Sequence, residues 1–253
     1  MRRWLLVILS AALLTGCATS AKREAALKVV DSEYKYGKAS FLERKYPDAA
    51  AHFRAALEVD PESTKVLYAL AHVYYAQGDY RETEDVVKRI VLVDPEHGDG
   101  TNLLGMTYGK QGRHREAIET FARAADLRDF RSPHFALHNK GIEHLFLGET
   151  ALAEESFHAA IRRVPEYYPA RADLAKLYID SGRWAEAAEQ WRTFLDLAPD
   201  LHEGHYFLGR AYIGLGKSVL AAKELDDFLA KVDSTHPLVP EAQALLDDLS
   251  PGR

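Results

Sequence analysis

The segment that decides the fold is Tyr168–Asp200, which reads YPARADLAKLYIDSGRWAEAAEQWRTFLDLAPD. It carries a small residue, an aromatic three positions later, a glycine four after that, then an alanine, bulky apolar residues and a proline. These are Ala175, Tyr178, Gly182, Ala187, Trp191, Phe194 and Pro199. The same order of residue types recurs along the chain at 34 residues in every step but one. A period of this length predicts stacked helical hairpins, because one such hairpin cannot bury its apolar face alone.

This order is the signature of tetratricopeptide repeats, each of which is a helix–turn–helix unit. It predicts an all-α fold, a tetratricopeptide-repeat superhelix of six helical hairpins plus a C-terminal capping helix. The predicted repeats cover residues 25–62, 63–96, 97–131, 132–166, 167–200 and 201–234, and the capping helix covers residues 238–250.

Two classes of small residue in the repeats have a physical reason. A small residue in each first helix, such as Gly37 or Gly141, is expected to let the two helices of a hairpin approach closely. Its expected partner is the alanine-type position of the second helix, such as Ala49 or Ala153. A second set of glycines suits a left-handed residue at the end of each first helix. That set is Gly78, Gly112, Gly148, Gly182 and Gly216.

Residues 1–16 have the pattern of an export signal. Arg2 and Arg3 precede the apolar run Trp4–Leu14, whose 11 residues are too few to span a hydrocarbon core of ~30 Å. The run ends in Leu-Thr-Gly before Cys17, the only cysteine of the chain. This resembles the bacterial lipobox, in which the cysteine thiol receives a diacylglycerol and becomes the first mature residue. The alternative is an ordinary signal peptide with an accidental cysteine.

Residues 17–24 are therefore expected to form an acylated tether. In lipoproteins of diderm bacteria, aspartate after the cysteine marks inner-membrane retention, and Ala18 stands there instead. The expected location is the outer membrane, lipid-anchored, with the periplasmic face favoured. Two or more acyl chains anchor stably. An extended tether from Ala18 to Glu24 reaches at most ~25 Å, which keeps the folded body close to that membrane.

The charge balance limits the classes of partner. The chain has 253 residues, of which 28% are charged, and a formal net charge of −6. Nucleic-acid binding requires a basic footprint, so nucleic acid is not an expected partner. A single cysteine excludes an internal disulfide. The chain is expected to be a monomer that contacts the membrane through its N-terminal lipid.

The repeat is irregular between the third and fourth copies, where the step is 36 residues. In the helix that follows, Phe135, Ile142, Leu145 and Phe146 share one face. They form either an apolar pocket in the middle of the groove or, if the insertion rotates the helix, part of the core. The sequence leaves both interpretations open.

The concave face of the repeats is the expected partner surface, because apolar and aromatic side chains on a rigid scaffold suit a segment of another protein. For each side chain the alternative is packing against a neighbouring helix. The candidate groove residues are Tyr34, Phe41, Tyr68, His72, Tyr75, Asn102, Met106, Phe135, His138, Ile142 and Leu145.

The sequence contains no recognisable catalytic motif. His134 and His138 are four residues apart, which places two rings on one helical face, but no further ligand completes a metal motif. Adjacent acids on a helix, such as Asp226 and Asp227, point apart and are mostly solvated. The repeats occupy the chain after the tether. The sequence therefore predicts a protein that is not an enzyme, with no catalytic residue, no metal and no cofactor.

The anchor and the repeats together resemble the pilotin lipoproteins of type IV pilus systems. The most particular part of the resemblance is the irregular link from Asp126 to Gly141. It is followed by Ala153, Phe157, Pro165, Tyr178 and Gly182, with Asn139 two residues before Gly141. The resemblance implies a protein-binding assembly factor that helps the pilus secretin reach, insert or multimerise in the outer membrane, as pilus biogenesis and pilus-driven motility require. The implied partner is an outer-membrane secretin subunit or another envelope protein.

Two other functional classes stay open at this stage. One is a repeat lipoprotein that acts as a scaffold for cell-wall enzymes or for outer-membrane protein insertion, which the same anchor and groove could serve. The other is a metal-dependent enzyme that uses His134 and His138. Neither has a sequence motif of its own.

Overall fold

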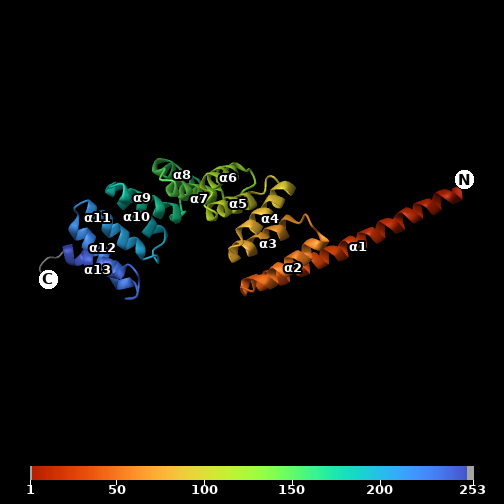
Figure 1. Ribbon diagram of the computed structural model, residues 1–253, viewed down its shortest axis with the longest axis horizontal. Coiled ribbons are helices and arrows are strands. Elements are labelled where there is room, and N and C mark those ends of the chain that lie inside the picture. The colour runs from red at the N-terminus through yellow and green to blue at the C-terminus, as the bar shows by residue number, and fades with distance from the viewer. Residues whose placement is uncertain (1, 250–253) are drawn as a thin grey trace. The chain divides into compact units, whose positions relative to one another are not determined.

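The computed structural model describes residues 2–249, with side chains from Lys22 to Leu249. Every regular element within residues 2–249 is an α-helix, and consecutive helices pair into hairpins (Figure 1). The predicted all-α tetratricopeptide-repeat fold is confirmed. The predicted lipid-attachment residue Cys17 and the apolar run Trp4–Leu14 lie outside the residues whose side chains are described.

The chain divides into two compact units. Unit 1 contains the residues up to Thr120 together with residues 127–130, and unit 2 contains residues 121–126 and the residues from Arg131 onward. The helices of unit 1 are α1 (Arg2–Leu42), α2 (Tyr46–Val59), α3 (Thr64–Gln77), α4 (Tyr80–Val93), α5 (Gly98–Lys110) and the first part of α6 (His114–Asp126). Unit 2 holds α7 (Pro133–Phe146), α8 (Thr150–Arg163), α9 (Tyr168–Asp180), α10 (Trp184–Leu197), α11 (Glu203–Gly214), α12 (Ser218–Lys231) and α13 (Val239–Leu249).

Helix α1 begins earlier than the sequence pattern indicates. It is continuous from Arg2 to Leu42, whereas the repeat pattern places the start of the helix near Ala25 and an extended tether at residues 17–24. The physical reason is composition, since alanine and leucine are the commonest residues of α1 and no proline interrupts it. Eight helical residues span about 12 Å, about half the reach of an extended tether.

The predicted left-handed glycines are confirmed. Gly78, Gly112, Gly148, Gly182 and Gly216 all have φ between 67° and 82°. At the first of these turns, the Asp79 N–H donates to the Tyr74 carbonyl at 2.9 Å, which closes the end of α3. Arg44 holds the same place in the first hairpin, 34 residues before Gly78, with φ 59°. It is the one non-glycine residue with positive φ in the described chain.

Two of the small residues of the first helices face an aromatic ring. A Cβ added to Gly37 would lie 2.6 Å from the Phe53 ring, and one added to Gly141 would lie 2.5 Å from the Phe157 ring. For these two glycines the expectation of an alanine partner is corrected, because the nearest atoms belong to the phenylalanine one helical turn further on. Each of the two glycines therefore makes room for a phenyl group that is buried between the two helices. At Gly209, by contrast, an added Cβ would lie 3.0 Å from Leu225 and 3.4 Å from the carbonyl oxygen of Ala221, the predicted partner.

Substituting Gly141 by alanine tests this packing. We expect Gly141→Ala to lower the free energy of unfolding of unit 2 by about 1–3 kcal/mol, because a methyl group overpacks the site. In a Phe157→Leu background, urea denaturation should show a clearly smaller decrease in the free energy of unfolding for the same substitution, since the two positions are in contact. An equal cost in both backgrounds would show that the ring is not what excludes the methyl group.

An arginine links successive hairpins in the same way in both units. In unit 1, Arg113 Nη1 lies 2.7 Å from Glu84 Oε2, and its guanidinium lies 4.1 Å from the centre of the Tyr108 ring. In unit 2, Arg183 Nη1 lies 2.6 Å from Glu154 Oε2, and its guanidinium also lies 4.1 Å from a tyrosine ring, that of Tyr178. The recurrence shows that the repeat period sets ion pairs as well as apolar packing.

The core of unit 2 consists of two clusters of buried apolar side chains, and Phe207 packs against both. Trp191 is 1% exposed, and its ring stacks on that of Phe207 at 4.7 Å. Towards the C-terminus, Leu225 and Phe228 of α12 are fully buried together with Ala242 of α13. Helix α13 therefore covers the last hairpin, as a terminal cap must.

In the irregular link between α6 and α7, the aromatic side chain of Phe130 is buried. Phe130 is 6% exposed, and a Cβ added to Gly98 at the start of α5 would lie 2.3 Å from the Phe130 Cβ atom. Glycine at position 98 thus makes room for this side chain.

Among the described residues, no helix is both long and apolar enough to span a bilayer.

Candidate functional site

Unit 1 contains a pocket of about 440 Å³ with largely aromatic walls. Helices α1, α2 and α3 supply most of its lining, and the start of α5 supplies the rest. The lining residues are Tyr34, Lys38, Phe41, Phe53, Thr64, Lys65, Tyr68, Ala69, His72, His97 and Asp99. Four of the predicted groove residues, Tyr34, Phe41, Tyr68 and His72, therefore line one cavity.

The aromatic walls are fixed by contacts between the helices. The Tyr34 ring lies 5.8 Å from the Phe53 ring, and the Lys65 ammonium lies 3.9 Å from the centre of the Tyr34 ring. On α3, Tyr68 and His72 are one helical turn apart, and their rings meet edge to face at 4.5 Å. These contacts hold the rings in defined orientations before any partner binds.

The rim of the pocket carries charge. Lys38, Lys65 and Asp99 are exposed lining residues, so two ammonium groups and one carboxylate border the cavity. His97 caps α5, and its Nδ1 atom accepts a hydrogen bond from the Gly100 N–H at 2.9 Å. The sequence did not predict Thr64, Lys65, His97 or Asp99, because they lie at helix starts and in a loop where the apolar period gives no signal.

Burial keeps neutral the two titratable rings that α3 contributes to the pocket, Tyr68 and His72. Desolvation, with a smaller contribution from the Asp99 carboxylate, raises the pKa of Tyr68 to about 12. Desolvation also lowers the pKa of His72 below its ordinary value, although Asp99 opposes this shift. At neutral pH this wall of the pocket is therefore aromatic and uncharged.

The lowered pKa of His72 predicts a pH dependence of stability. The folded state binds fewer protons at His72 than the unfolded chain, so the stability contributed by the neutral ring is present above pH 6.5 and is lost as the pH falls through the folded pKa. We expect urea denaturation of the wild type to show a larger loss between neutral and mildly acidic pH than that of His72→Gln. Parallel pH profiles for the two proteins would contradict the assignment.

The other three unit 1 candidates are not among the residues that line this pocket. The Tyr75 ring lies 5.5 Å from the Tyr80 ring of α4. Asn102 donates from Nδ2 to the Met106 Sδ atom at 3.7 Å, while its Oδ1 atom is buried without a hydrogen bond within the described residues. Four of the seven unit 1 candidates thus line the pocket, and a groove role for Tyr75, Asn102 and Met106 stays a prediction.

The unit 2 candidates divide between surface and core. Phe135 and Phe146 are 44% and 69% exposed, whereas Ile142 and Leu145 pack against the core of unit 2. The core interpretation of this helix therefore holds for Ile142 and Leu145, which were groove candidates and are partly buried against the core cluster of unit 2. The pocket interpretation stays a prediction for the exposed Phe135 and Phe146.

His138 lies in a hydrogen-bonded cluster and does not present a free ring. Its Nε2 atom is 2.8 Å from Asp173 Oδ2, its Nδ1 atom is 3.1 Å from the Tyr167 hydroxyl, and the residue is 8% exposed. Burial would raise the pKa of Asp173, but the hydrogen bond from His138 and the nearby Lys176 charge outweigh it, so this pKa is lowered. The cluster ties α7 to α9.

The rings of the sequence-predicted His134–His138 pair have other contacts in the described structure. Both nitrogens of His138 have hydrogen-bond partners, and the His134 ring packs against Tyr167 at 4.9 Å. Within the residues whose side chains are described, the pair belongs to no group of three potential metal ligands. The hypothesis of a metal-dependent enzyme at these two residues stays a prediction.

Sequence comparison identifies the repeats. Three tetratricopeptide-repeat models match residues 40–107, 102–129 and 172–234. A repeat-containing protein of Treponema pallidum is 30% identical over 168 residues, which is 58% of this chain and 20% of that protein. This chain thus spans about a fifth of that relative's length, and the match concerns the repeats.

Comparison with solved structures extends the similarity to most of the chain. The structure of PilW, described as a widely conserved type IV pilus biogenesis factor, is similar with a TM-score of 0.71 at 20% identity, over 86% of this chain and 98% of PilW. The structure of PilF from Pseudomonas aeruginosa is similar with a TM-score of 0.70 at 18% identity, over 90% and 95% of the two chains. The helical hairpins, their left-handed turns and these matches show that the chain is a protein of the tetratricopeptide-repeat fold.

Proposed function

We propose that this chain is an outer-membrane lipoprotein that binds a subunit of the type IV pilus secretin and assists its assembly. It would act as a pilotin, through binding and without catalysis. The N-terminal lipid on Cys17 would hold it at the periplasmic face of the membrane in which the secretin multimer forms. The proposed partner is a protein, and no cofactor is required.

The observation that carries the proposal is the extent of the structural similarity. The structural match to PilW, a pilus biogenesis factor, extends over 98% of PilW and 86% of this chain. Repeat number and arrangement vary among proteins of this fold, so TM-scores of 0.71 and 0.70 over 86% and 90% of this chain are more informative than a match to single repeats. The lipobox-like cysteine adds an anchor suited to a membrane-bound partner.

The pocket of unit 1 supports a binding role. Its volume of about 440 Å³ is within the range of cavities that accept a ligand, and aromatic side chains are common anchors in protein interfaces. The walls are preformed by ring contacts, which lowers the entropic cost of binding. An apolar side chain of an extended or helical segment would fit between Tyr34, Phe41 and Tyr68.

Removing two walls of the pocket should weaken partner recovery. We expect Phe41→Ala combined with Tyr68→Ala to reduce crosslinked recovery of the secretin subunit by roughly tenfold or more, as for the loss of anchors worth about 2 kcal/mol. The matched control is Tyr36→Ala, because Tyr36 lies on the same helix as Phe41, is 58% exposed and does not line the pocket. Equal recovery with both proteins would place the contact elsewhere.

The function itself is tested in cells of the source bacterium. We expect deletion of the gene to remove detergent-resistant secretin multimers from the outer membrane, while monomer levels and cell-wall synthesis stay normal. The wild-type gene should restore the multimers, and the Phe41→Ala, Tyr68→Ala double variant should not. Normal multimers in the deletion strain would reject the pilotin role, and a defect confined to wall synthesis would favour a scaffold of wall enzymes.

A further inference from the structure

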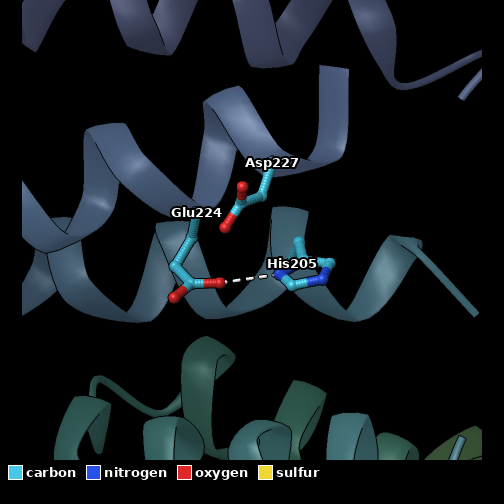
Figure 2. Close-up of side chains that lie close together, drawn as sticks. All are labelled: His205, Glu224 and Asp227. Atoms are coloured by element: carbon cyan, nitrogen blue, oxygen red, sulfur yellow. Dashed lines mark hydrogen bonds and ion pairs between the residues drawn. The ribbon is translucent and has the colours of Figure 1, made fainter. Parts of the chain in front are cut away.

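A histidine and two carboxylates from neighbouring helices of the sixth hairpin point towards one another. Figure 2 shows Glu224 and Asp227 projecting from α12 towards His205 on α11. One ligand atom from each of the three residues lies within 4.8 Å of the others. From this arrangement we propose a binding site for a divalent transition-metal ion, with zinc as the best-suited ion, that joins α11 to α12.

The geometry requires only small side-chain movements. Zinc–nitrogen and zinc–oxygen distances near 2.1 Å place tetrahedral ligands about 3.4 Å apart. His205 Nδ1 and Glu224 Oε2 are already 2.7 Å apart, so one ion can reach both atoms. For Nδ1 to bind the ion, the ring proton would be carried on Nε2, and the Lys231 ammonium, now 3.0 Å from Nε2, would move away. Glu224 and Asp227 are three residues apart on one helix face, a spacing also used for paired ligands in helical metal sites.

The state of Asp227 gives the second argument. Within the described part of the chain its carboxylate has no hydrogen bond and no ion pair, although it is only partly exposed and lies beside Glu224. Two neighbouring carboxylates place negative charge beside the His205 ring, which a divalent cation would balance. Lys231 supplies one positive charge on the other side of the ring, where its Nζ atom lies 3.0 Å from His205 Nε2.

The donor set selects the class of ion. Imidazole nitrogen with two carboxylate oxygens suits zinc and its neighbours in the first transition row, whereas calcium and magnesium prefer an all-oxygen shell. Three protein ligands leave a fourth position for water or for a ligand from another molecule. The ion would join α11 to α12 within the last hairpin. This inference is independent of the pilotin proposal.

The test is zinc titration of the untagged full chain in detergent, after treatment with a chelator, by isothermal calorimetry. We expect one tight zinc per chain, with affinity reduced tenfold or more in Asp227→Asn and in His205→Gln. Asp227→Asn should fold normally, because this carboxylate makes no hydrogen bond that the variant would lose. The matched control is Asp226→Asn, which changes the adjacent exposed acid on α12 and should leave zinc affinity unchanged.

The visible spectrum of the cobalt-substituted protein gives an independent readout. We expect the absorption of a tetrahedral cobalt centre in the wild type and in Asp226→Asn, and its loss in Asp227→Asn. Absence of stoichiometric zinc uptake by the wild type would overturn the proposal. Equal uptake by the His205→Gln, Asp227→Asn double variant would also overturn it, because the ion would then be bound by other groups among the 11 histidines of the chain.

Discussion

Replacing Trp191 by alanine is expected to lower the free energy of unfolding of unit 2 by about 3–5 kcal/mol, the range observed for large aromatic residues in cores. Trp191 is 1% exposed, stacks on Phe207 at 4.7 Å and meets the Phe194 ring at 5.1 Å. Truncation would leave a cavity between α10 and α11, which the rigid helices could close only in part. Urea denaturation followed by circular dichroism measures the change.

The matched variant is Trp191→Phe. The Trp191 Nε1 atom is buried and has no hydrogen-bond partner within the described residues, so removing this N–H group breaks no hydrogen bond. A phenyl ring also keeps part of the contact with Phe207. We therefore expect a clearly smaller loss for Trp191→Phe than for Trp191→Ala, and similar losses for both would mean that ring stacking does not stabilise this part of the core.

Replacing Cys17 by serine is expected to remove the chain from the outer-membrane fraction and to abolish labelling with radioactive palmitate. A serine hydroxyl does not replace the thiol in lipoprotein maturation. Each buried methylene contributes ~0.8 kcal/mol to membrane binding, so loss of the acyl chains removes essentially all of the expected anchoring energy. The stability of the repeats, measured by denaturation, should not change.

The residue after Cys17 provides a matched control. Ala18→Asp should keep the palmitate label but shift the chain to the inner-membrane fraction, because aspartate at this place marks inner-membrane retention. Membrane fractionation of the two variants thus separates acylation from sorting. A Cys17→Ser protein that still fractionates with the outer membrane would reject the lipid anchor and leave the repeats as a protein held there by other means.

The repeat period allowed most of the fold to be predicted. The positions of Gly78 and Gly148, for example, follow from the period, and both residues have the predicted left-handed conformation. Such features depend on the local backbone and recur in every hairpin. The partners of Gly37 and Gly141 were not predicted correctly, because which side chain fills the space between two helices depends on their separation and rotation.

The candidate site could be predicted only in part. Tyr34, Phe41, Tyr68 and His72 were found because helical spacing places them on one face, but His97 and Asp99 join the same pocket from a loop and a helix start. Ile142 and Leu145 are partly buried and pack against the core, although their spacing also allowed a groove position. An insertion changes the rotation of the helix that follows, and the spacing within that helix does not report this rotation.

The sequence alone thus determined the class of fold, the number of hairpins, the places of their turns and the expectation of a lipid at Cys17, since these depend on residue types at fixed local spacing. Only the tertiary structure decided which side chains meet across helices. It brought Tyr34 to Lys65, His138 to Asp173, and His205 to Glu224 and Asp227. Such contacts depend on how neighbouring helices are packed and rotated, and a residue's spacing along its own helix does not contain that information.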